Sequence, residues 1–263
     1  VQANVRNAAS VAAAVAGADA VVNAVGIYFQ RGRQRFDIVH RDGAHNIGAA
    51  ARAAGVRRLV HVSGLGAEES DSSSPYVRSK GAAEAATRQA FPGATILRPS
   101  VIFGPGDTFF TNLASIARLS PVMPAIGGDH SKFQPVYVGD VAAAVGVCLN
   151  DAATAGQTYE LGGPNVYTMR QLAELVLAVT ARRSKRVVYM PFALTKMMGL
   201  AGQFLPRPPI TFDQAYMLEK DSVVHAGMPG LAELGIVPSA PEVILPTYLE
   251  RFRPTGSYSA TAA

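Results

Sequence analysis

The chain has 263 residues, enough to bury one large domain or one domain with a smaller appendage. Its formal charge is +5, but the densest basic stretches, RGRQR and ARRSKR, are short and lack interleaved aromatic residues, which argues against a nucleic-acid-binding face. The single cysteine, Cys148, leaves no partner for a disulfide within the chain and is expected to be buried and inert, and the histidines show no metal-ligand spacing, so we expect no metal site.

The first part of the chain alternates short apolar segments with helix-like segments. ADAVVNAVG (18–26), RRLVHVSG (57–64) and ATILRPSVIFG (94–104) have the composition of buried strands. Between them, FDIVHRDGAHNIGAAARAAG (36–55) repeats apolar residues at helical spacing and ends on a glycine, and YVRSKGAAEAATRQA (76–90) is an Ala-rich helix. Three such units in series predict an α/β fold, a Rossmann-type doubly wound parallel sheet.

After Gly104 the composition changes to Pro- and Gly-rich segments separated by short helices. Thr168 with Gln171, and Thr211 with Gln214, have the spacing of capping boxes at the starts of two of these helices. We therefore expect a Rossmann-like domain over residues 1–104, to which later segments return, and a smaller irregular carboxyl-terminal α/β lobe over 105–263. The stretch PFALTKMMGLAGQFLP is too short to span a bilayer, and two readings stay open: a helix that covers a substrate cleft, or a contact with a membrane surface.

Ser63, Tyr76 and Lys80 are the candidate catalytic residues. Ser63 directly follows a strand, and Tyr76 and Lys80 lie one helical turn apart on the next helix, so all three are expected at the rim where ligands bind in an open α/β sheet. An ammonium group about 5 Å from a phenol favours the phenolate by about 3 kcal/mol at an effective dielectric near 20. We therefore expect Lys80 to lower the pKa of Tyr76 and to make it a general acid or base for a carbonyl–alcohol couple. A second pair, Tyr216 and Lys220, lacks a strand-end serine and is expected to pack.

Five further residues have simpler expectations. His61 lies within a buried strand and is expected to be a satisfied core histidine. Arg98, at a strand end, either meets a substrate anion or ties two loops together. Asp140 fits the N-cap of the helix that follows it. Gly104 and Gly106 fit turns at the mouth of a substrate site.

Several motifs in order along the chain resemble a known family. Ser63, YVRSK and ILRPSVIFGPGD, preceded by VVNAVG, are similar to the extended or atypical short-chain dehydrogenase/reductases, often described as NAD-dependent epimerase/dehydratase-like proteins. FPGATILRPSVIFGPGDTFF, FQPVYVGDVAAAV, TYELGGPNVYT and PGLAELGI are similar to the nucleotide-binding accessory subunit of respiratory complex I and its bacterial relatives. The resemblance covers nearly the whole chain.

The resemblance implies a cofactor, NADP(H) or NAD(H), and assigns residues to it. It matches Tyr76, Lys80 and Ser63 to the catalytic triad, of which Tyr76 and Lys80 also bind the cofactor. The remaining matched positions are Asn4 and Val5 at the adenine, Ala24, Val25 and Gly26 at the adenosine ribose, and Pro99, Ser100 and Val101 beside the nicotinamide.

Two functions follow from the resemblance. The first is an NAD(P)-dependent oxidoreductase or epimerase-type enzyme with an unidentified small-molecule substrate. The alternative is a non-catalytic nucleotide-binding subunit or assembly factor for a respiratory complex or a quinone pathway. Either function predicts a cytoplasmic protein, or one held peripherally on the inner membrane by a respiratory complex or a membrane-surface partner.

Two departures from the family pattern matter. No GxxGxxG or GxGxxG phosphate loop occurs, and by this resemblance the chain starts at about the third strand of the fold, so we expect a fragment or processed product that binds the nucleotide poorly by itself. His40 stands where many extended members carry an asparagine that supports the proton relay, which weakens the case for full dehydrogenase activity.

Overall fold

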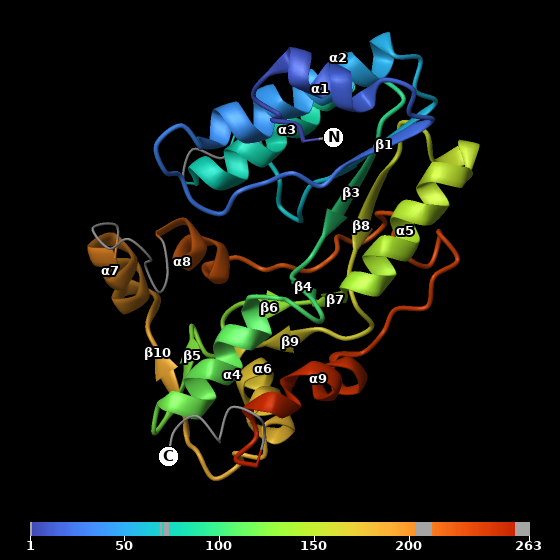
Figure 1. Cartoon of the computed structure of the whole chain (residues 1–263). Coiled ribbons are helices and arrows are strands. Elements are labelled where there is room, and N and C mark those ends of the chain that lie inside the picture. Colours follow the sequence, from blue (N-terminus) through green and yellow to red (C-terminus); the bar gives the residue numbers. More distant parts are fainter. Residues whose placement is uncertain (1, 69, 71–73, 203–211, 256–263) are drawn as a thin grey trace. The chain divides into compact units, whose positions relative to one another are not determined.

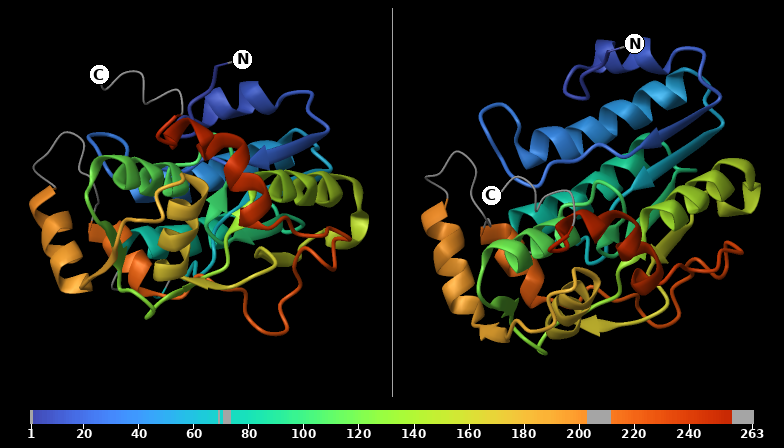
Figure 2. Two further views of the ribbon diagram at one scale, coloured as in Figure 1. Left: turned by 90° about the horizontal axis from the view of Figure 1, so that it is seen from below. Right: turned by 60° about the horizontal axis from the view of Figure 1, so that its bottom comes forward.

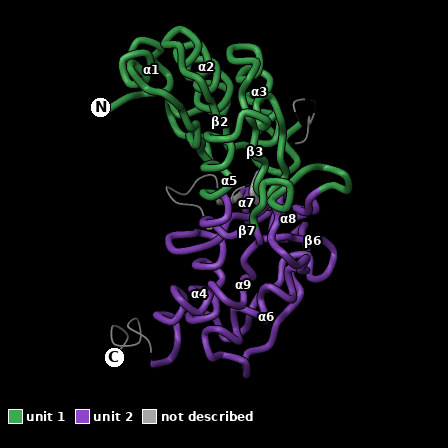
Figure 3. The backbone as a smooth tube through the Cα atoms, turned by 90° about the vertical axis from the view of Figure 1, so that its right-hand side faces the viewer, with its two compact units in different colours: residues 1–99, 142–161, 225–236 green, residues 100–141, 162–224, 237–263 purple. Residues whose placement is uncertain are grey.

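The computed structural model describes residues 2–68, 70, 74–202 and 212–255. The chain divides into two compact units, coloured green and purple in Figure 3. Unit 1 comprises Val1–Pro99, Ala142–Leu161 and His225–Ile236, and unit 2 comprises Ser100–Val141, Gly162–Val224 and Val237–Ala263. Two segments that are distant in sequence, 142–161 and 225–236, therefore belong to the first unit.

Unit 1 is built on a parallel sheet of four strands in the order β1–β2–β3–β8. The strands are β1 (Ala20–Asn23), β2 (Arg58–Val62), β3 (Thr95–Pro99) and β8 (Thr158–Leu161). Within the sheet, Asn23 is in register with His61, His61 with Ile96, and Ile96 with Thr158. This parallel sheet with flanking helices confirms the predicted fold class.

Helices cover both faces of the unit 1 sheet. In Figure 1, α2 (Gly43–Ala53) and α3 (Pro75–Ala90) lie on one side and α5 (Val138–Asn150), most of which belongs to unit 1, lies on the other. The amino-terminal helix α1 (Ala8–Val15) packs on α2 through Val11, Val15, Ile47 and Ala51. A π-helical turn, η1 (Asp37–Asp42), leads directly into α2, and a 3₁₀ turn, η2 (Ala152–Thr154), precedes β8.

Unit 2 consists of short elements around one apolar core. Its strands pair in twos: β4 (Ile102–Phe103) with β7 (Val136–Tyr137), β10 (Val187–Met190) with β5 (Met123–Ile126), and β6 (Lys132–Phe133) with β9 (Tyr167–Thr168). Its helices include α4 (Phe109–Leu119), α6 (Met169–Val179), α7 (Phe192–Gly202), α8 (Phe212–Glu219), α9 (Pro241–Leu249) and the 3₁₀ turn η3 (Glu250–Phe252). The helices α4, α6 and α9 lie beside one another (Figure 2). Each contributes buried side chains to this core.

Most local predictions agree with these elements. Gly55 directly follows the last turn of α2 with φ of 69°, a conformation that favours glycine at a helix end. Thr168 and Gln171 form the complete capping box of α6, whereas Thr211 lies outside the described residues. Cys148 is buried, and burial raises the pKa of its thiol, as expected for an inert cysteine.

The prediction for Asp140 is wrong. The helix α5 begins at Val138, so Asp140 already lies in its first turn. Its carboxylate instead accepts hydrogen bonds from the Ser239 backbone N–H at 2.7 Å and from the Ser239 hydroxyl at 3.1 Å. Asp140 therefore ties the start of α5 to the carboxyl-terminal segment of unit 2.

Candidate functional site

Lys80 reaches the carboxyl end of β2, where Ser63 follows the strand. The helix α3 begins next to Tyr76 because Ser74 caps it, accepting from the Val77 N–H at 3.3 Å, with a proline in the first turn. One turn further along, buried Lys80 donates from Nζ to the Val62 carbonyl oxygen at 3.2 Å. Ser63, the next residue, is also buried, and its Oγ has no hydrogen-bond partner within the described part of the chain. The structure thus places all three candidate catalytic residues in unit 1.

Tyr76 is packed among aromatic rings. Its ring stacks on Tyr28 with centroids 6.0 Å apart and meets Phe36 and His40 edge-on at 5.6 and 5.7 Å. Burial, with a smaller effect of Tyr28, raises the pKa of Tyr76 above its usual range. The prediction that Lys80 lowers this pKa is therefore wrong for the chain by itself, because loss of solvation on burial dominates and raises it. The phenol is protonated at neutral pH and is a hydrogen-bond donor.

The pKa of Lys80 is shifted in the opposite direction, downward. Burial lowers the pKa of its amine to about 8, while Glu84 acts against that change. The amine is therefore still mostly protonated at neutral pH, but it gives up its proton far more readily than an exposed lysine.

Three of the five positions expected to meet the adenosine, Asn4, Val5 and Val25, border one cavity, whereas Ala24 and Gly26 are not among its lining residues. It has a volume of about 560 Å³ and is lined by residues that include Asn4, Val5, Val25, Ile27 and Gln34. This volume is within the range of small-molecule sites. The family resemblance assigned Asn4, Val5 and Val25 to the nucleotide, and the fold brings them to the same cavity. Gln34 has no motif in the sequence that could have identified it.

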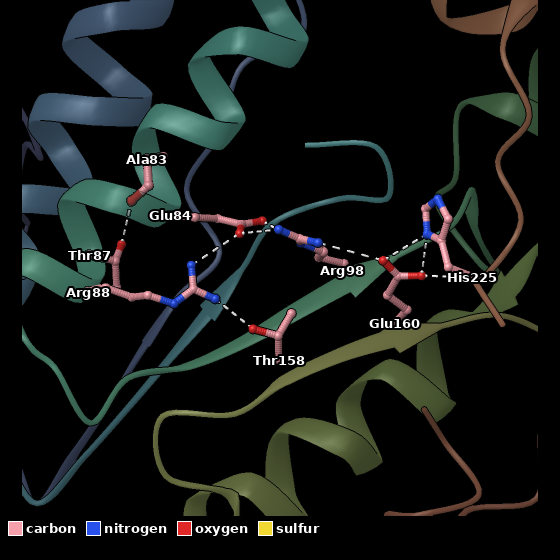
Figure 4. Close-up of polar contacts among 8 residues, drawn as sticks. All are labelled: Ala83, Glu84, Thr87, Arg88, Arg98, Thr158, Glu160 and His225. Carbon is pink, nitrogen blue, oxygen red and sulfur yellow. Dashed lines mark hydrogen bonds and ion pairs between the residues drawn. The ribbon is translucent and has the colours of Figure 1, made fainter. Parts of the chain in front are cut away.

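Arg98 lies within a buried charge network (Figure 4). Its guanidinium donates to both carboxylate oxygens of Glu84, at 2.9 and 2.8 Å, and lies 3.7 Å from Glu160. Glu160 in turn accepts from the backbone N–H of His225 at 2.8 Å and lies 2.8 Å from its Nδ1. Of the two expectations for Arg98, the structure therefore shows the tie: it joins α3, β3, β8 and the segment 225–236. Sequence patterns did not reveal the two buried carboxylates.

The remaining predicted positions are dispersed. Pro99 ends the first stretch of unit 1, whereas Ser100 and Val101 belong to unit 2, where the Ser100 hydroxyl donates to the Ser222 carbonyl at 2.7 Å. In unit 2, Lys220 Nζ lies 5.0 Å from the Tyr216 ring centroid, a cation–π contact that fits a packing role.

The two glycines after β4 have turn conformations. Gly104 and Gly106 have φ values of 146° and 90°. A side chain at Gly104 would place its Cβ 2.6 Å from Val138 Cγ1. Both observations agree with the expected turn.

The fold and these residues define a nucleotide-binding protein. Residues 1–109 match the NAD(P)H-binding family, and residues 66–167 match the 3-beta hydroxysteroid dehydrogenase/isomerase family. The chain has an NAD(P)-binding fold like that of the extended short-chain dehydrogenase/reductases, as the sequence motifs predicted. It superimposes on dTDP-glucose 4,6-dehydratase DesIV from Streptomyces venezuelae, solved with NAD bound, with a TM-score of 0.70 and 20% identity over 96% of this chain and 78% of that one.

Two curated relatives make the likeness more specific. NADH dehydrogenase (ubiquinone) 1 alpha subcomplex subunit 9, mitochondrial, from Arabidopsis thaliana is 36% identical over 244 residues, which are 89% of this chain and 60% of the relative. Ceramide reductase from Caulobacter vibrioides is 42% identical over 127 residues, which are 48% of this chain and 39% of the relative. The chain thus spans 60% of the length of the Arabidopsis relative.

The described residues fit part of a nicotinamide nucleotide. The cavity beside Asn4, Val5 and Val25 suits the adenosine end, and the unpartnered Ser63 hydroxyl suits a polar ligand atom. Within the described ranges, no cluster of three or more potential metal ligands occurs, and no helix has the length and apolar character needed to cross a membrane.

Proposed function

We propose that this chain is the nucleotide-binding part of an NAD(P)-dependent oxidoreductase that reduces a carbonyl group. The observation that supports it best is the pairing of a protonated phenol, Tyr76, with the ammonium of Lys80 one turn away on α3. At neutral pH the phenol holds its proton, which is the form that carbonyl reduction requires of a proton donor.

Each residue has a distinct role in this proposal. Ser63, whose hydroxyl is buried and unpartnered among the described residues, donates a hydrogen bond to the carbonyl oxygen. Tyr76 donates the proton that this oxygen gains. Lys80, held against Val62, supplies positive charge that stabilises the phenolate left behind. A bound nicotinamide supplies the hydrogen and electron pair for the carbonyl carbon.

The similarity to ceramide reductase favours a lipid as the carbonyl substrate. Exposed apolar side chains on α7 agree with such a substrate: Leu194, Met197, Met198 and Leu200 are between 41% and 62% exposed. An apolar face of this kind gives contact with a membrane surface without spanning it.

The second candidate function is a nucleotide-holding subunit without turnover, in an assembly that resembles the NADH dehydrogenase of the Arabidopsis relative. The similarity to that relative extends over 89% of the chain. The packing of Tyr76 against Tyr28, Phe36 and His40 also suits a structural tyrosine. In this role the protein is peripheral on the inner membrane, and the bound nucleotide stabilises the fold by mass action.

One substitution separates the two functions. Tyr76→Phe in the complete protein removes the phenol proton and keeps the ring packing, and Tyr216→Phe is the matched control. The enzyme proposal expects Tyr76→Phe to abolish reduction of a ceramide-like ketone while NADPH and NADH affinities, measured by calorimetry, stay within about twofold. If a Tyr76→Phe strain respires and makes its lipids normally, whereas loss of nucleotide binding depletes the protein, the structural function is correct.

A further inference from the structure

The turn after β1 is held by two side-chain acceptors that the sequence places far apart. The Val25 backbone N–H donates to Asn23 Oδ1 at 3.1 Å, and the Ile27 backbone N–H donates to His40 Nε2 at 2.9 Å. The turn residues Ala24, Val25 and Gly26 are exposed. The turn is therefore fixed from beneath while its outer surface stays open to a ligand.

His61 contacts Asn23, the first of these two acceptors. Asn23 and His61 are in register on neighbouring strands, and Asn23 Nδ2 lies 2.9 Å from His61 Nδ1. An amide nitrogen carries only donors, so His61 Nδ1 must be the acceptor and the imidazole proton must lie on Nε2. If Nδ1 carried a proton, the Asn23 amide would have to rotate, and its oxygen would leave Val25.

His40 supplies the second anchor in the opposite tautomer. Its Nε2 accepts from Ile27, so its proton lies on Nδ1, which donates to Ser79 Oγ at 2.8 Å. The Ser79 hydroxyl then donates to the Tyr76 carbonyl oxygen at 2.7 Å. This chain of hydrogen bonds joins the turn to the first turn of α3, which carries Tyr76.

We propose that His40 and His61, as neutral imidazoles of opposite tautomer, are positioning residues that hold the turn 24–27 in its nucleotide-binding conformation. Both rings are buried, with 3% and 2% exposed, so neither is free to reorient in solvent. The inference rests on the proposed placement of the nucleotide at Ala24, Val25 and Gly26. A turn that is ordered before binding loses less conformational entropy when the ligand arrives, which raises affinity without adding contacts.

The tautomers are measurable in the unmodified protein. Long-range ¹⁵N–¹H correlation spectra of the imidazole rings at pH 7 distinguish Nδ1–H, Nε2–H and charged forms. We expect His40 as Nδ1–H and His61 as Nε2–H. A charged ring, or the same tautomer at both positions, overturns the proposal whatever the nucleotide does.

Binding measurements test the positioning role. His61→Leu and His40→Leu each remove one acceptor, and NADPH and NADH affinities in the complete protein are expected to fall roughly five- to tenfold, the weight of one hydrogen bond. His61→Gln and His40→Gln, which keep an acceptor, should restore part of the affinity. His45→Leu, at an exposed position on α2, is the matched control and should leave affinity unchanged. Amide exchange at Val25 and Ile27 should quicken in the two Leu variants of His61 and His40.

Gly26→Val separates failure of this inference from failure of the nucleotide placement. Gly26 is exposed at the turn, and the nearest atom to a Cβ there is His40 Nε2 at 3.5 Å, an ordinary van der Waals contact, so the fold accommodates an added side chain at the surface where the nucleotide is placed. If Gly26→Val abolishes binding and both histidine variants bind normally, the positioning role is wrong and the placement stands. If all three variants bind as well as the unmodified protein, the nucleotide does not lie at this turn and the placement itself fails.

Discussion

Arg98 and Glu84 form a two-pronged ion pair, with Nε to Oε1 at 2.9 Å and Nη2 to Oε2 at 2.8 Å. The Glu84 side chain is 3% exposed and that of the neighbouring Glu160 is 1% exposed, so Arg98 is the cation that compensates two buried carboxylates. Arg88 also reaches Glu84, at 3.4 Å, from one turn along the same helix. Removal of Arg98 therefore leaves buried negative charge with too little compensation.

We expect Arg98→Met to lower the free energy of unfolding by about 3 kcal/mol, since breaking a buried pair on one side strands the other charge. Arg57→Met is the control, because the Arg57–Asp19 pair is 77% and 86% exposed and such pairs contribute little. Urea denaturation measures both variants. If both variants lose the same free energy of unfolding, burial of the charges around Arg98 has no effect on stability.

Substitution by alanine at two glycines inside helices should change the stability of the protein in opposite directions. A Cβ at Gly48, on α2, would lie 2.8 Å from the Ala90 Cβ of α3, so Gly48→Ala must push the two helices apart and should destabilise by about 1–3 kcal/mol. A Cβ at Gly146, on α5, meets nothing within 4 Å, so Gly146→Ala should stabilise by up to about 1 kcal/mol through helix propensity. Thermal unfolding of both variants checks the pair, and stabilisation by Gly48→Ala would contradict the close approach of α2 and α3.

The buried histidines predict a loss of stability in mild acid. Burial, with Lys80 as the next cause, lowers the pKa of His40 to about 4 and that of His61 to about 3, and His61 also feels His40 and Arg88. Both values lie below the 6.5 of a free imidazole, so below pH 6.5 the unfolded chain takes up protons that the folded chain refuses.

The stabilising effect is complete above pH 6.5 and is lost as the pH falls toward the folded values, at about 1.4 kcal/mol per pH unit for each histidine. Urea denaturation between about pH 6.5 and pH 4.5 should show this slope for the unmodified protein. The double variant His40→Leu/His61→Leu should have a shallower slope, and comparison of the two slopes cancels the shared contribution of carboxylates. Equal slopes would mean that the two rings are already protonated in the folded protein.

The exposed apolar face of α7 predicts binding to membranes. Met197 and Leu200 are 62% and 58% exposed, and the double variant Met197→Ser/Leu200→Ser should reduce cosedimentation with anionic phospholipid vesicles several-fold, by loss of apolar burial. Leu119→Ser, at a position 79% exposed on α4, is the matched control. If the control reduces sedimentation as much as the double variant, general surface hydrophobicity explains the binding and α7 has no special role.

The sequence by itself determined the parallel sheet, the end of α2, the start of α6 and the relation of Tyr76 to Lys80. Each of these follows from short-range rules: alternating or 3.6-residue periodicity, a glycine at the end of α2, and a capping box at Thr168. Asp140 marks the limit of such rules. Its residue type suits a helix cap, but α5 begins two positions earlier because its start is set by the strand β7 that leads into it.

Only the tertiary structure decided the chemistry of the site. The pKa of Tyr76 depends on how deeply Tyr28, Phe36 and His40 enclose its ring, and all three of these residues lie outside α3. The role of Arg98 likewise depends on Glu84 and Glu160. The turn 24–27 is anchored because His40 and Asn23 accept hydrogen bonds from its backbone, and Asn23 is in turn in contact with His61. Solvation and hydrogen bonding act over a few ångströms in space. These contacts of Tyr76, of Arg98 and of the two histidines join residues that lie 13 to 62 positions apart in the sequence, so no local pattern encodes them.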